Sequence, residues 1–258
     1  KIERAHETKE VKKILKEKYI KEIFPKVYYK FSQKPINDSK IIFMETGTGR
    51  APSLAYMYLN LKKDKSNIIH YYNLKKGYVS MKEYYNNAKA FIKDAATAKV
   101  IFVCTSNNLM GYFKLRPETI YIQLWHGCGA FKKIGLSSIG KASGNDASEI
   151  NEYPINTNYS YVTVSSQNLK WIFEDSMGIK KDSKIILPIG VSATDVYYDD
   201  EYKKNSFSKL YKQIPFAKTK KIILYAPTFR GKNTNPVSSD KLDIEKMYNA
   251  FGKEYILI

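Results

Sequence analysis

Cysteine and histidine are both scarce in this sequence. Its 258 residues include 2 cysteines, Cys104 and Cys128, and 3 histidines. The cysteines show no CxxC spacing and no neighbouring histidine cluster, which argues against a zinc site and against a disulfide framework. We therefore expect no metal and no cofactor, and a reducing compartment such as the cytosol.

Long apolar runs are missing as well, and so is a secretory signal peptide. No stretch approaches the roughly 20 consecutive apolar residues that a membrane-spanning helix needs. The first residue is Lys1 rather than methionine. We expect the chain to be a piece of a longer polypeptide.

Acidic residues are few relative to basic ones. The sequence has 43 lysines and arginines against 25 aspartates and glutamates, which gives a formal net charge of +18. This imbalance favours an anionic partner: a phosphate-bearing substrate, an anionic membrane face or a nucleic acid. Part of the charge reflects composition alone, because lysine is abundant together with isoleucine, asparagine and tyrosine. With 43% hydrophobic residues, the chain is apolar enough to fold around a core.

Residues 1–35 predict a basic amphipathic helical segment. Apolar residues recur at steps of three and four between about residues 8 and 31, and lysines fill most of the other positions. Pro25 is expected to kink or divide this helix. Two arrangements remain open: docking on an anionic lipid surface, or packing on the next domain with a solvated lysine face.

From residue 36 on, short apolar runs alternate with helical patterns. This alternation is typical of an α/β fold with a Rossmann-like parallel sheet covered on both faces. We assign residues 36–200 to this domain, 201–220 to a lysine-rich linker and 221–258 to the start of a second Rossmann-like domain. A lone strand-helix-strand unit cannot bury both faces of a sheet, so we expect the chain to continue past Ile258. The sequence predicts strands at about residues 40–45, 67–74, 100–104, 119–125, 161–165, 184–187, 221–226 and 255–258, helices at about 52–63, 81–98, 167–177 and 241–251, and one irregular loop at 135–152.

Polar residues follow several of these apolar runs. In open parallel sheets, ligands bind beyond the carboxyl ends of the strands, so these residues are expected to meet at one rim. Glycine N–H groups, hydroxyls and an arginine fork all suit phosphate oxygens. The Gly47/Gly49 turn is a weak phosphate site, because a third glycine is missing and Glu45 lies beside it. The candidate residues for phosphate or donor binding are Gly127, Lys132, Ser165, Asp195, Thr228 and Arg230.

His126 is the candidate catalytic residue. It follows an apolar run and precedes Gly127, and an imidazole takes up and releases protons near neutral pH. Lys132 and Lys133 lie a few residues further on, where their charge suits a phosphate. The alternatives are ordinary structural roles, namely a structural histidine and a solvated lysine pair.

Two segments resemble the signatures of a known family. They are Gln123-Leu124-Trp125-His126-Gly127, continuing through Phe131-Lys132-Lys133-Ile134-Gly135, and Tyr225-Ala226-Pro227-Thr228-Phe229-Arg230. Both resemble the CDP-glycerol glycerophosphotransferase family, whose enzymes build teichoic acids and related capsular polymers. A third segment, residues 190–195, is similar to the family's Gly-x-Pro-Arg-Thr-Asp but carries Ser192 and Ala193 in place of proline and arginine. The resemblance covers about residues 90–232.

The resemblance implies a GT-B fold. A first Rossmann-like domain would hold the acceptor and His126, and a second, truncated in this sequence, would hold the CDP-activated donor. The family's His-Pro and Asp-Tyr-Ser-Ser segments are not in this sequence, which implies weak donor binding and an inactive isolated chain.

The resemblance also implies the reaction and the place where it occurs. A hydroxyl of a lipid-linked or polymer acceptor would attack CDP-glycerol or CDP-ribitol, His126 would take the proton, and CMP would leave. Arg230, Thr228 and Lys132 would hold phosphate oxygens. The implied location is cytoplasmic, peripheral on the inner face of the bacterial cell membrane.

Three alternatives stay open. One is a GT-B nucleotide-sugar glycosyltransferase, and another is a membrane-docking subunit without catalysis. The third is a basic nucleic-acid-binding protein, which the charge and the 22 tyrosines favour. The lysines are scattered and no RNA-binding motif is present, so we expect no nucleic-acid partner.

Overall fold

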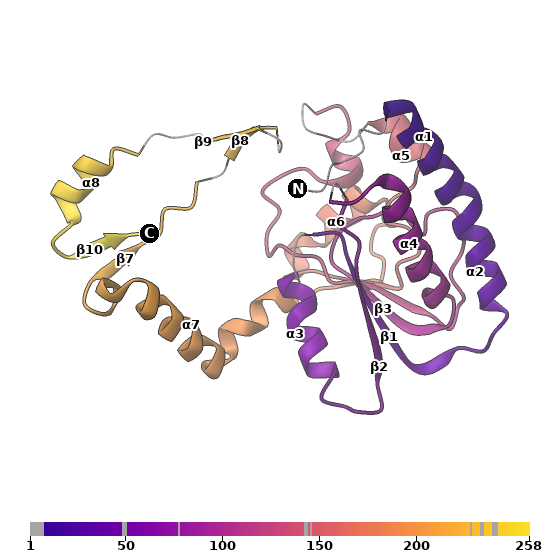
Figure 1. The fold of residues 1–258 in the computed structure, drawn as a ribbon, viewed down its shortest axis with the longest axis horizontal. Coiled ribbons are helices and arrows are strands. Elements are labelled where there is room, and N and C mark those ends of the chain that lie inside the picture. Colours follow the sequence, from indigo (N-terminus) through magenta and orange to yellow (C-terminus); the bar gives the residue numbers. More distant parts are fainter. Residues whose placement is uncertain are drawn as a thin grey trace. The chain divides into compact units, whose positions relative to one another are not determined.

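The computed structural model describes residues 8–47, 51–76, 78–141, 144, 146–227, 229–232, 235–238 and 242–258. The chain divides into two compact units, Lys1–Asp195 and Val196–Ile258. Figure 1 shows the elements of both.

The first unit is built on a six-stranded parallel sheet, which confirms the predicted α/β fold. The strand order is β2-β1-β3-β4-β5-β6, and every neighbouring pair is parallel. The order changes direction between β1 and β3, and such switch points are where open α/β sheets bind ligands. The strands are β1 (Asn37–Glu45), β2 (Ile68–Asn73), β3 (Ala98–Val103), β4 (Ile120–Gln123), β5 (Tyr161–Thr163) and β6 (Ile186–Leu187).

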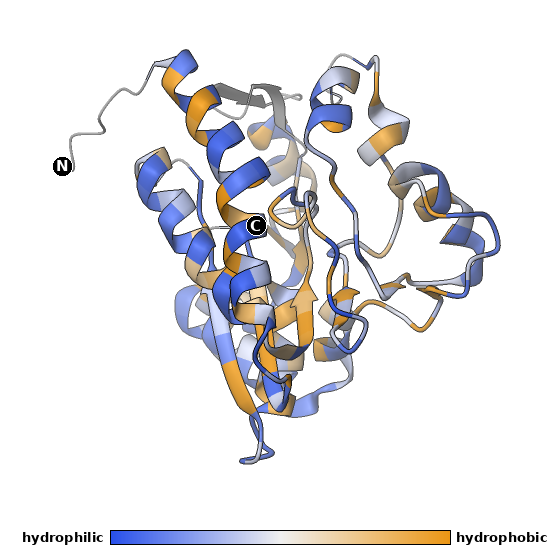
Figure 2. Ribbon diagram, turned by 90° about the vertical axis from the view of Figure 1, so that its right-hand side faces the viewer, coloured by the Kyte–Doolittle hydropathy of each residue, from blue (hydrophilic) through white to orange (hydrophobic). Residues whose placement is uncertain are grey.

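Both faces of the sheet are buried because the central strands are apolar on both sides. In β1, Ile42 and Met44 join a core with α4 (Met81–Ala95) and α2 (Phe24–Ser32). The alternate residues of β1 pack on the other face against α3 (Pro52–Leu61). A third cluster lies under α6 (Lys170–Met177), beside β5 and β6. Figure 2 shows hydrophobic strands between helices that are partly hydrophilic.

The amino-terminal segment is helical and packs on this domain. It runs through α1 (Lys9–Glu17), a π-helical turn (Lys18–Ile23) and α2. The π-helical turn lies directly before Pro25, where the sequence predicts a kink. Four apolar side chains of the segment, Tyr19, Ile20, Phe24 and Tyr28, are buried in the core with α4. The apolar side chains of this segment are therefore used mainly inside the protein.

The expectation of one irregular loop at residues 135–152 is wrong. The structure has a 3-10 turn at Gly135–Ser138 and a helix, α5 (Ala147–Glu152). The side chain of Asp146 accepts a hydrogen bond from the Glu149 N–H and so caps α5. An acidic cap followed three residues later by glutamate is close to the capping-box signal for a helix start.

The second unit contains the strand-helix-strand pattern expected after residue 220. Strand β7 (Lys221–Ile223) pairs in parallel with β10 (Tyr255–Leu257), and α8 (Ile244–Phe251) precedes β10. An antiparallel pair, β8 (Phe229–Lys232) and β9 (Asn235–Ser238), lies between them in sequence. Residues 201–220, predicted as a linker, contain most of α7 (Asp200–Gln213) and a 3-10 turn at Pro215–Lys218. No helix in the described part of the chain is long and apolar enough to cross a membrane.

Candidate active site at the Trp-His-Gly turn

The chain leaves β4 at the carboxyl edge of the sheet in a fixed position. The Leu124 N–H donates to the Val103 carbonyl at 2.7 Å, which extends the pairing of β4 with β3 by one residue. The Thr163 hydroxyl donates to the Leu124 carbonyl at 3.0 Å. The turn that follows therefore starts from a residue held by strands on both sides.

Trp125 has a left-handed backbone conformation, with φ at 57°. A bulky residue rarely adopts this conformation, because its side chain crowds the backbone. The Trp125 N–H donates to Gln123 Oε1 at 3.0 Å, and Gln123, which is fully buried, donates through Nε2 to the Tyr159 hydroxyl at 3.0 Å. The indole is buried and packs edge-on against Phe173, with ring centroids 5.3 Å apart. Packing and hydrogen bonds together stabilise a turn that the backbone alone disfavours.

The strained turn presents His126 at the exposed rim. His126 Nδ1 lies 2.7 Å from the Cys104 carbonyl oxygen. A carbonyl only accepts hydrogen bonds, so Nδ1 is the nitrogen that carries the proton. In the neutral ring, Nε2 is then left as a hydrogen-bond acceptor. The ring also lies against Trp125, with centroids 4.5 Å apart. The tautomer with the proton on Nδ1 is the one a general base requires, because Nε2 can then accept a proton.

His126 borders a hollow of about 210 Å³ at the carboxyl edge of the sheet. Gly127 and Lys132 also line it, together with Phe131, whose side chain is 97% exposed. Lys132 brings a positive charge to the hollow, whereas Lys133 is not part of its lining. Three of the candidate residues, His126, Gly127 and Lys132, therefore line one hollow.

Ser165 stabilises the same turn from the end of β5. Its hydroxyl donates to the carbonyl oxygen of Cys128. Ser165 was predicted to bind phosphate, but in this structure its proton is directed to the protein backbone.

The rim continues to the ends of β1 and β3. The hydroxyls of Thr46 and Thr105 lie 3.1 Å apart. The Glu45 side chain is buried and accepts hydrogen bonds from Asn73 Nδ2, at 2.8 Å, and from the Ala51 N–H before α3. The Ala51 N–H therefore already donates to a carboxylate and is not available to a phosphate. This is consistent with a weak phosphate site at the Gly47/Gly49 turn. Gly49 itself lies outside the described residues.

The Cys104 thiol is not a nucleophile candidate. Burial, followed by the negative charge of Glu45, raises the pKa of Cys104 to about 12. The thiol therefore stays protonated at neutral pH, and the thiolate is the reactive form. The contribution of Cys104 to the site is its backbone carbonyl.

The remaining predicted residues are not part of this hollow. Asp195 is exposed on a 3-10 turn, Ser192–Tyr198, and does not line it. Within the first unit, the Ser192 hydroxyl at the start of this turn donates to the Ser53 carbonyl at 2.6 Å. The backbone of Arg230 lies in β8, and Thr228 lies outside the described residues.

Sequence reasoning missed the residues that orient His126. The Cys104 carbonyl carries no signal in the sequence, because every residue has one. Gln123 does carry a signal, since a polar residue inside an apolar strand run has to find hydrogen-bond partners when it is buried. Thr163 carries a similar, weaker signal near the end of β5.

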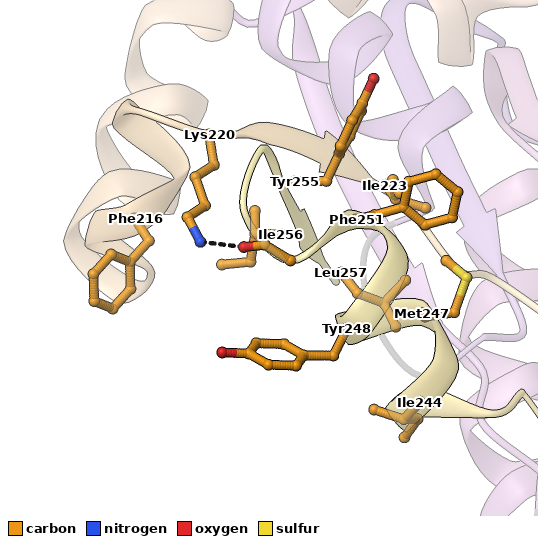
Figure 3. Close-up of a pocket in the computed structure, with 11 residues that line it drawn as sticks. Phe216, Lys220, Ile223, Ile244, Met247, Tyr248, Phe251, Tyr255, Ile256 and Leu257 are labelled. Carbon is orange, nitrogen blue, oxygen red and sulfur yellow. Dashed lines mark hydrogen bonds between the residues drawn. The ribbon is translucent and has the colours of Figure 1, made fainter.

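A second hollow, of about 310 Å³, lies in the second unit (Figure 3). Its lining is mostly apolar and comes largely from α8, β7 and β10. Lys220 is the charged residue in the lining, and its ammonium donates to the Gly252 carbonyl at 2.5 Å. This hollow offers little that would orient a charged ligand.

Among the described residues, no group of three or more histidine, cysteine, aspartate or glutamate side chains is placed to hold a metal ion.

Comparison with known proteins supports the resemblance. The sequence model of the CDP-glycerol:poly(glycerophosphate) glycerophosphotransferase family matches residues 27–258. This match is wider than the range of about 90–232 that the motifs indicated.

Curated relatives come from teichoic acid synthesis. A teichoic acid poly(ribitol-phosphate) polymerase of Bacillus spizizenii is 34% identical over 165 residues, which is 63% of this chain and 26% of the relative. A teichoic acid glycerol-phosphate primase of Bacillus subtilis is 34% identical over 160 residues, which is 62% of this chain and 40% of the relative. The aligned part of the chain thus spans about a quarter to two fifths of these relatives.

Solved structures show the same fold. The wall teichoic acid polymerase TagF matches with a TM-score of 0.63 at 18% identity, over 97% of this chain and 65% of that one. A variant of the same polymerase soaked with CDPG matches with a TM-score of 0.65.

Proposed function

Because the chain belongs to the CDP-glycerol:poly(glycerophosphate) glycerophosphotransferase family, we propose that it takes part in transferring a polyol phosphate from a CDP-activated donor to an acceptor hydroxyl. The donor is CDP-glycerol or CDP-ribitol, and the product is a teichoic acid or a related capsular polymer. CMP is the leaving group.

The observation that carries this proposal is the hydrogen bond between His126 Nδ1 and the Cys104 carbonyl. It fixes the proton on Nδ1 and leaves Nε2 of the neutral ring as an acceptor. The ring stands at an exposed hollow that Lys132 also lines. An acceptor for a hydroxyl proton and a cation for a phosphate therefore lie at one site.

In the proposed reaction the acceptor hydroxyl oxygen attacks the β-phosphorus of the donor. A new P–O bond forms while the bond between this phosphorus and the bridging oxygen breaks. CMP leaves with that electron pair, and His126 Nε2 takes the hydroxyl proton. Lys132 neutralises charge on the transferred phosphate, and Gly127 leaves room for it beside the histidine.

We assign the other candidates, apart from Ser165, to the donor. Thr228 and Arg230 follow β7 and would hold donor phosphate oxygens. Asp195 is a carboxylate and would accept a hydrogen bond from a donor hydroxyl, whereas the Ser165 hydroxyl keeps its bond to the Cys128 carbonyl. In this proposal residues 36–200 form the acceptor domain of a GT-B enzyme and residues 221–258 begin the donor domain.

The acceptor would be lipid-linked, so we place the protein on the inner face of the bacterial cell membrane. The exposed lysines of residues 1–35 support this, because positive charge attracts anionic lipid headgroups.

A panel of donors tests the proposed activity. We expect the full-length natural protein to release CMP from CDP-glycerol or CDP-ribitol when a glycerol phosphate acceptor is present, and to leave nucleotide sugars intact. Chromatography of the released nucleotide measures this. Turnover of a nucleotide sugar alone would make the protein a glycosyltransferase of the same fold instead.

The two neighbouring lysines provide a matched pair of variants. Lys132→Ala is expected to lower kcat/KM for CMP release by about 10- to 100-fold, because a charge-assisted contact with phosphate is lost. Lys133→Ala removes the same charge from a residue that does not line the hollow. We expect it to stay within about twofold of the wild type. Equal losses in both variants would show that only the overall charge of this loop matters.

A further inference from the structure

A large groove lies between the amino-terminal helix and α5. It has a volume of about 820 Å³ and is lined by Lys9, Lys12, Lys13 and Lys16 of α1, with Lys76 and with residues of α4 and α5. A smaller hollow of about 200 Å³ shares Lys76, Glu149 and Tyr153 with it. The two hollows adjoin at these residues and are together called the groove below. Figure 1 shows α1 and α5 side by side.

Positive charge in this groove is only partly neutralised. Lys16 pairs with Glu149 at 2.5 Å, and Glu152 pairs with Lys21 at 2.8 Å. The part of the chain that the structure describes provides no carboxylate within ion-pair distance of Lys9, Lys12, Lys13 or Lys76. Glu10 and Asp146 also line the groove, so its acidic residues are fewer than its lysines.

Lys76 lies at the junction of the two hollows. Much of its side chain is exposed, but protein atoms crowd the ammonium. This desolvation, followed by the positive charge of Lys16, lowers the pKa of Lys76, and Glu149 acts in the opposite direction. A bound anion would relieve the repulsion between the two lysines.

The smaller hollow lies beside residues that follow β3, the strand next to β4, and its lining is distinct from that of the hollow at His126. It is lined by Ser106, Asn107 and Asn108, which follow β3. Ser106 is two residues after Cys104, whose carbonyl bonds to His126, so their Cα atoms are at most about 7 Å apart. The groove thus has four lysines of α1 in one part and the residues that follow β3 in the other.

The spacing of the lysines suits a chain of charges rather than a single ion. Lys9, Lys12, Lys13 and Lys16 follow one another at helical steps, and at about 1.5 Å per residue they cover roughly 10 Å of the helix. Hydroxyl and amide groups at the rim end, from Ser106, Asn107 and Asn108, suit a polyol.

We propose that this groove binds the polyol-phosphate chain of the acceptor, a linear polyphosphodiester, and directs its terminal hydroxyl toward His126. The inference rests on the proposed function for the identity of the chain. It differs from membrane docking, because the ligand is the soluble polymer and not the lipid surface.

The test measures binding of a synthetic, lipid-free glycerol phosphate oligomer to residues 1–258 by fluorescence polarisation. The double variant Lys12→Glu/Lys13→Glu is expected to bind about tenfold more weakly or worse, because attraction becomes repulsion. Lys12→Gln/Lys13→Gln, which only removes charge, should show a smaller loss. The matched control is Lys26→Glu/Lys30→Glu on α2, where both lysines are exposed and line neither hollow. It should stay within about twofold of the wild type.

Three results would overturn the proposal. Unchanged oligomer binding by Lys12→Glu/Lys13→Glu would contradict the proposal. Equally weakened oligomer binding by the α2 control would also contradict it, because binding would then depend only on overall charge. The third uses phosphatidylglycerol vesicles as the probe. Loss of vesicle binding with intact oligomer binding would assign these lysines to the membrane.

The binding assay needs no donor and no turnover. If the donor panel fails while oligomer binding depends on Lys12 and Lys13, the groove stands and the proposed activity falls. If the full-length protein releases CMP while the groove variants bind the oligomer normally, the proposed activity is supported and the groove proposal is wrong.

Discussion

His126→Ala is expected to lower the rate of CMP release by about 10²- to 10⁴-fold, the range that a positioned general base contributes. The Nδ1 bond to the Cys104 carbonyl holds the ring so that only Nε2 is available as the base. Alanine removes this acceptor but keeps the left-handed turn and the Trp125 contacts with Phe173. The loss should therefore appear in kcat, with KM for the donor changed little. Quenched-flow or steady-state measurement of CMP with the full-length natural protein checks this.

Cys128→Ser is the control for this experiment. Cys128 is exposed, two residues from His126, and its contribution to the turn is a backbone carbonyl that serine retains. We expect wild-type turnover in this variant. Near-normal CMP release by His126→Ala, with Cys128→Ser also active, would assign proton removal to another group.

Asp94→Asn is expected to destabilise the protein by about 3–5 kcal/mol, because it leaves a mostly buried lysine without its counter-charge. Asp94 is on α4, and its side chain is 15% exposed. It accepts hydrogen bonds from Lys40 Nζ at 2.7 Å and from the Tyr72 hydroxyl at 3.2 Å, and it also bonds to His70. This cluster connects α4 with β1 and β2. Chemical denaturation followed by circular dichroism measures the loss in the free energy of unfolding.

The same carboxylate makes stability depend on pH. Burial alone would raise the pKa of Asp94, but hydrogen bonds from Lys40 and His70, with their charges, outweigh it and lower the pKa. A carboxyl with a lowered pKa in the folded state stabilises the fold above its unfolded pKa of about 3.9. This stabilisation is lost as the pH falls below that value toward the folded pKa. Asp94→Asn should therefore unfold with a weaker pH dependence in this acidic range.

Asp38→Asn is the matched surface control. Asp38 pairs with Lys99 at 3.2 Å, but its side chain is 83% exposed. Exposed ion pairs contribute about 0–1 kcal/mol. A loss of the same size in both variants would contradict a special role for the Asp94 cluster.

The sequence predicted the parallel sheet because its strands are buried on both faces. Continuous apolar runs such as Ile41–Met44 are typical of strands that are covered on both faces. The position of His126 at a strand end followed from the same pattern. The strand order did not, because pairing depends on contacts between distant residues.

The finer parts of the site were also beyond sequence reasoning. The proton on His126 Nδ1 is fixed by a carbonyl 22 positions earlier in the chain, and backbone groups are the same in every residue. The π-helical turn before Pro25 lies among aromatic residues that pack on α4, which is distant in sequence. Helix α5 is different, because the pair Asp146 and Glu149 is a readable helix-start signal.

The left-handed backbone of Trp125 sets a local conformational cost against tertiary packing. Glycine or asparagine would suit this backbone better, but replacing a buried indole leaves a cavity, and such a substitution costs about 3–5 kcal/mol. Either residue would remove the indole that packs against Phe173 and lies beside the His126 ring. The turn would gain conformational freedom, and the imidazole would lose the wall that limits its motion. The backbone conformation and the packing thus favour different residues at position 125, and the packing is the larger effect.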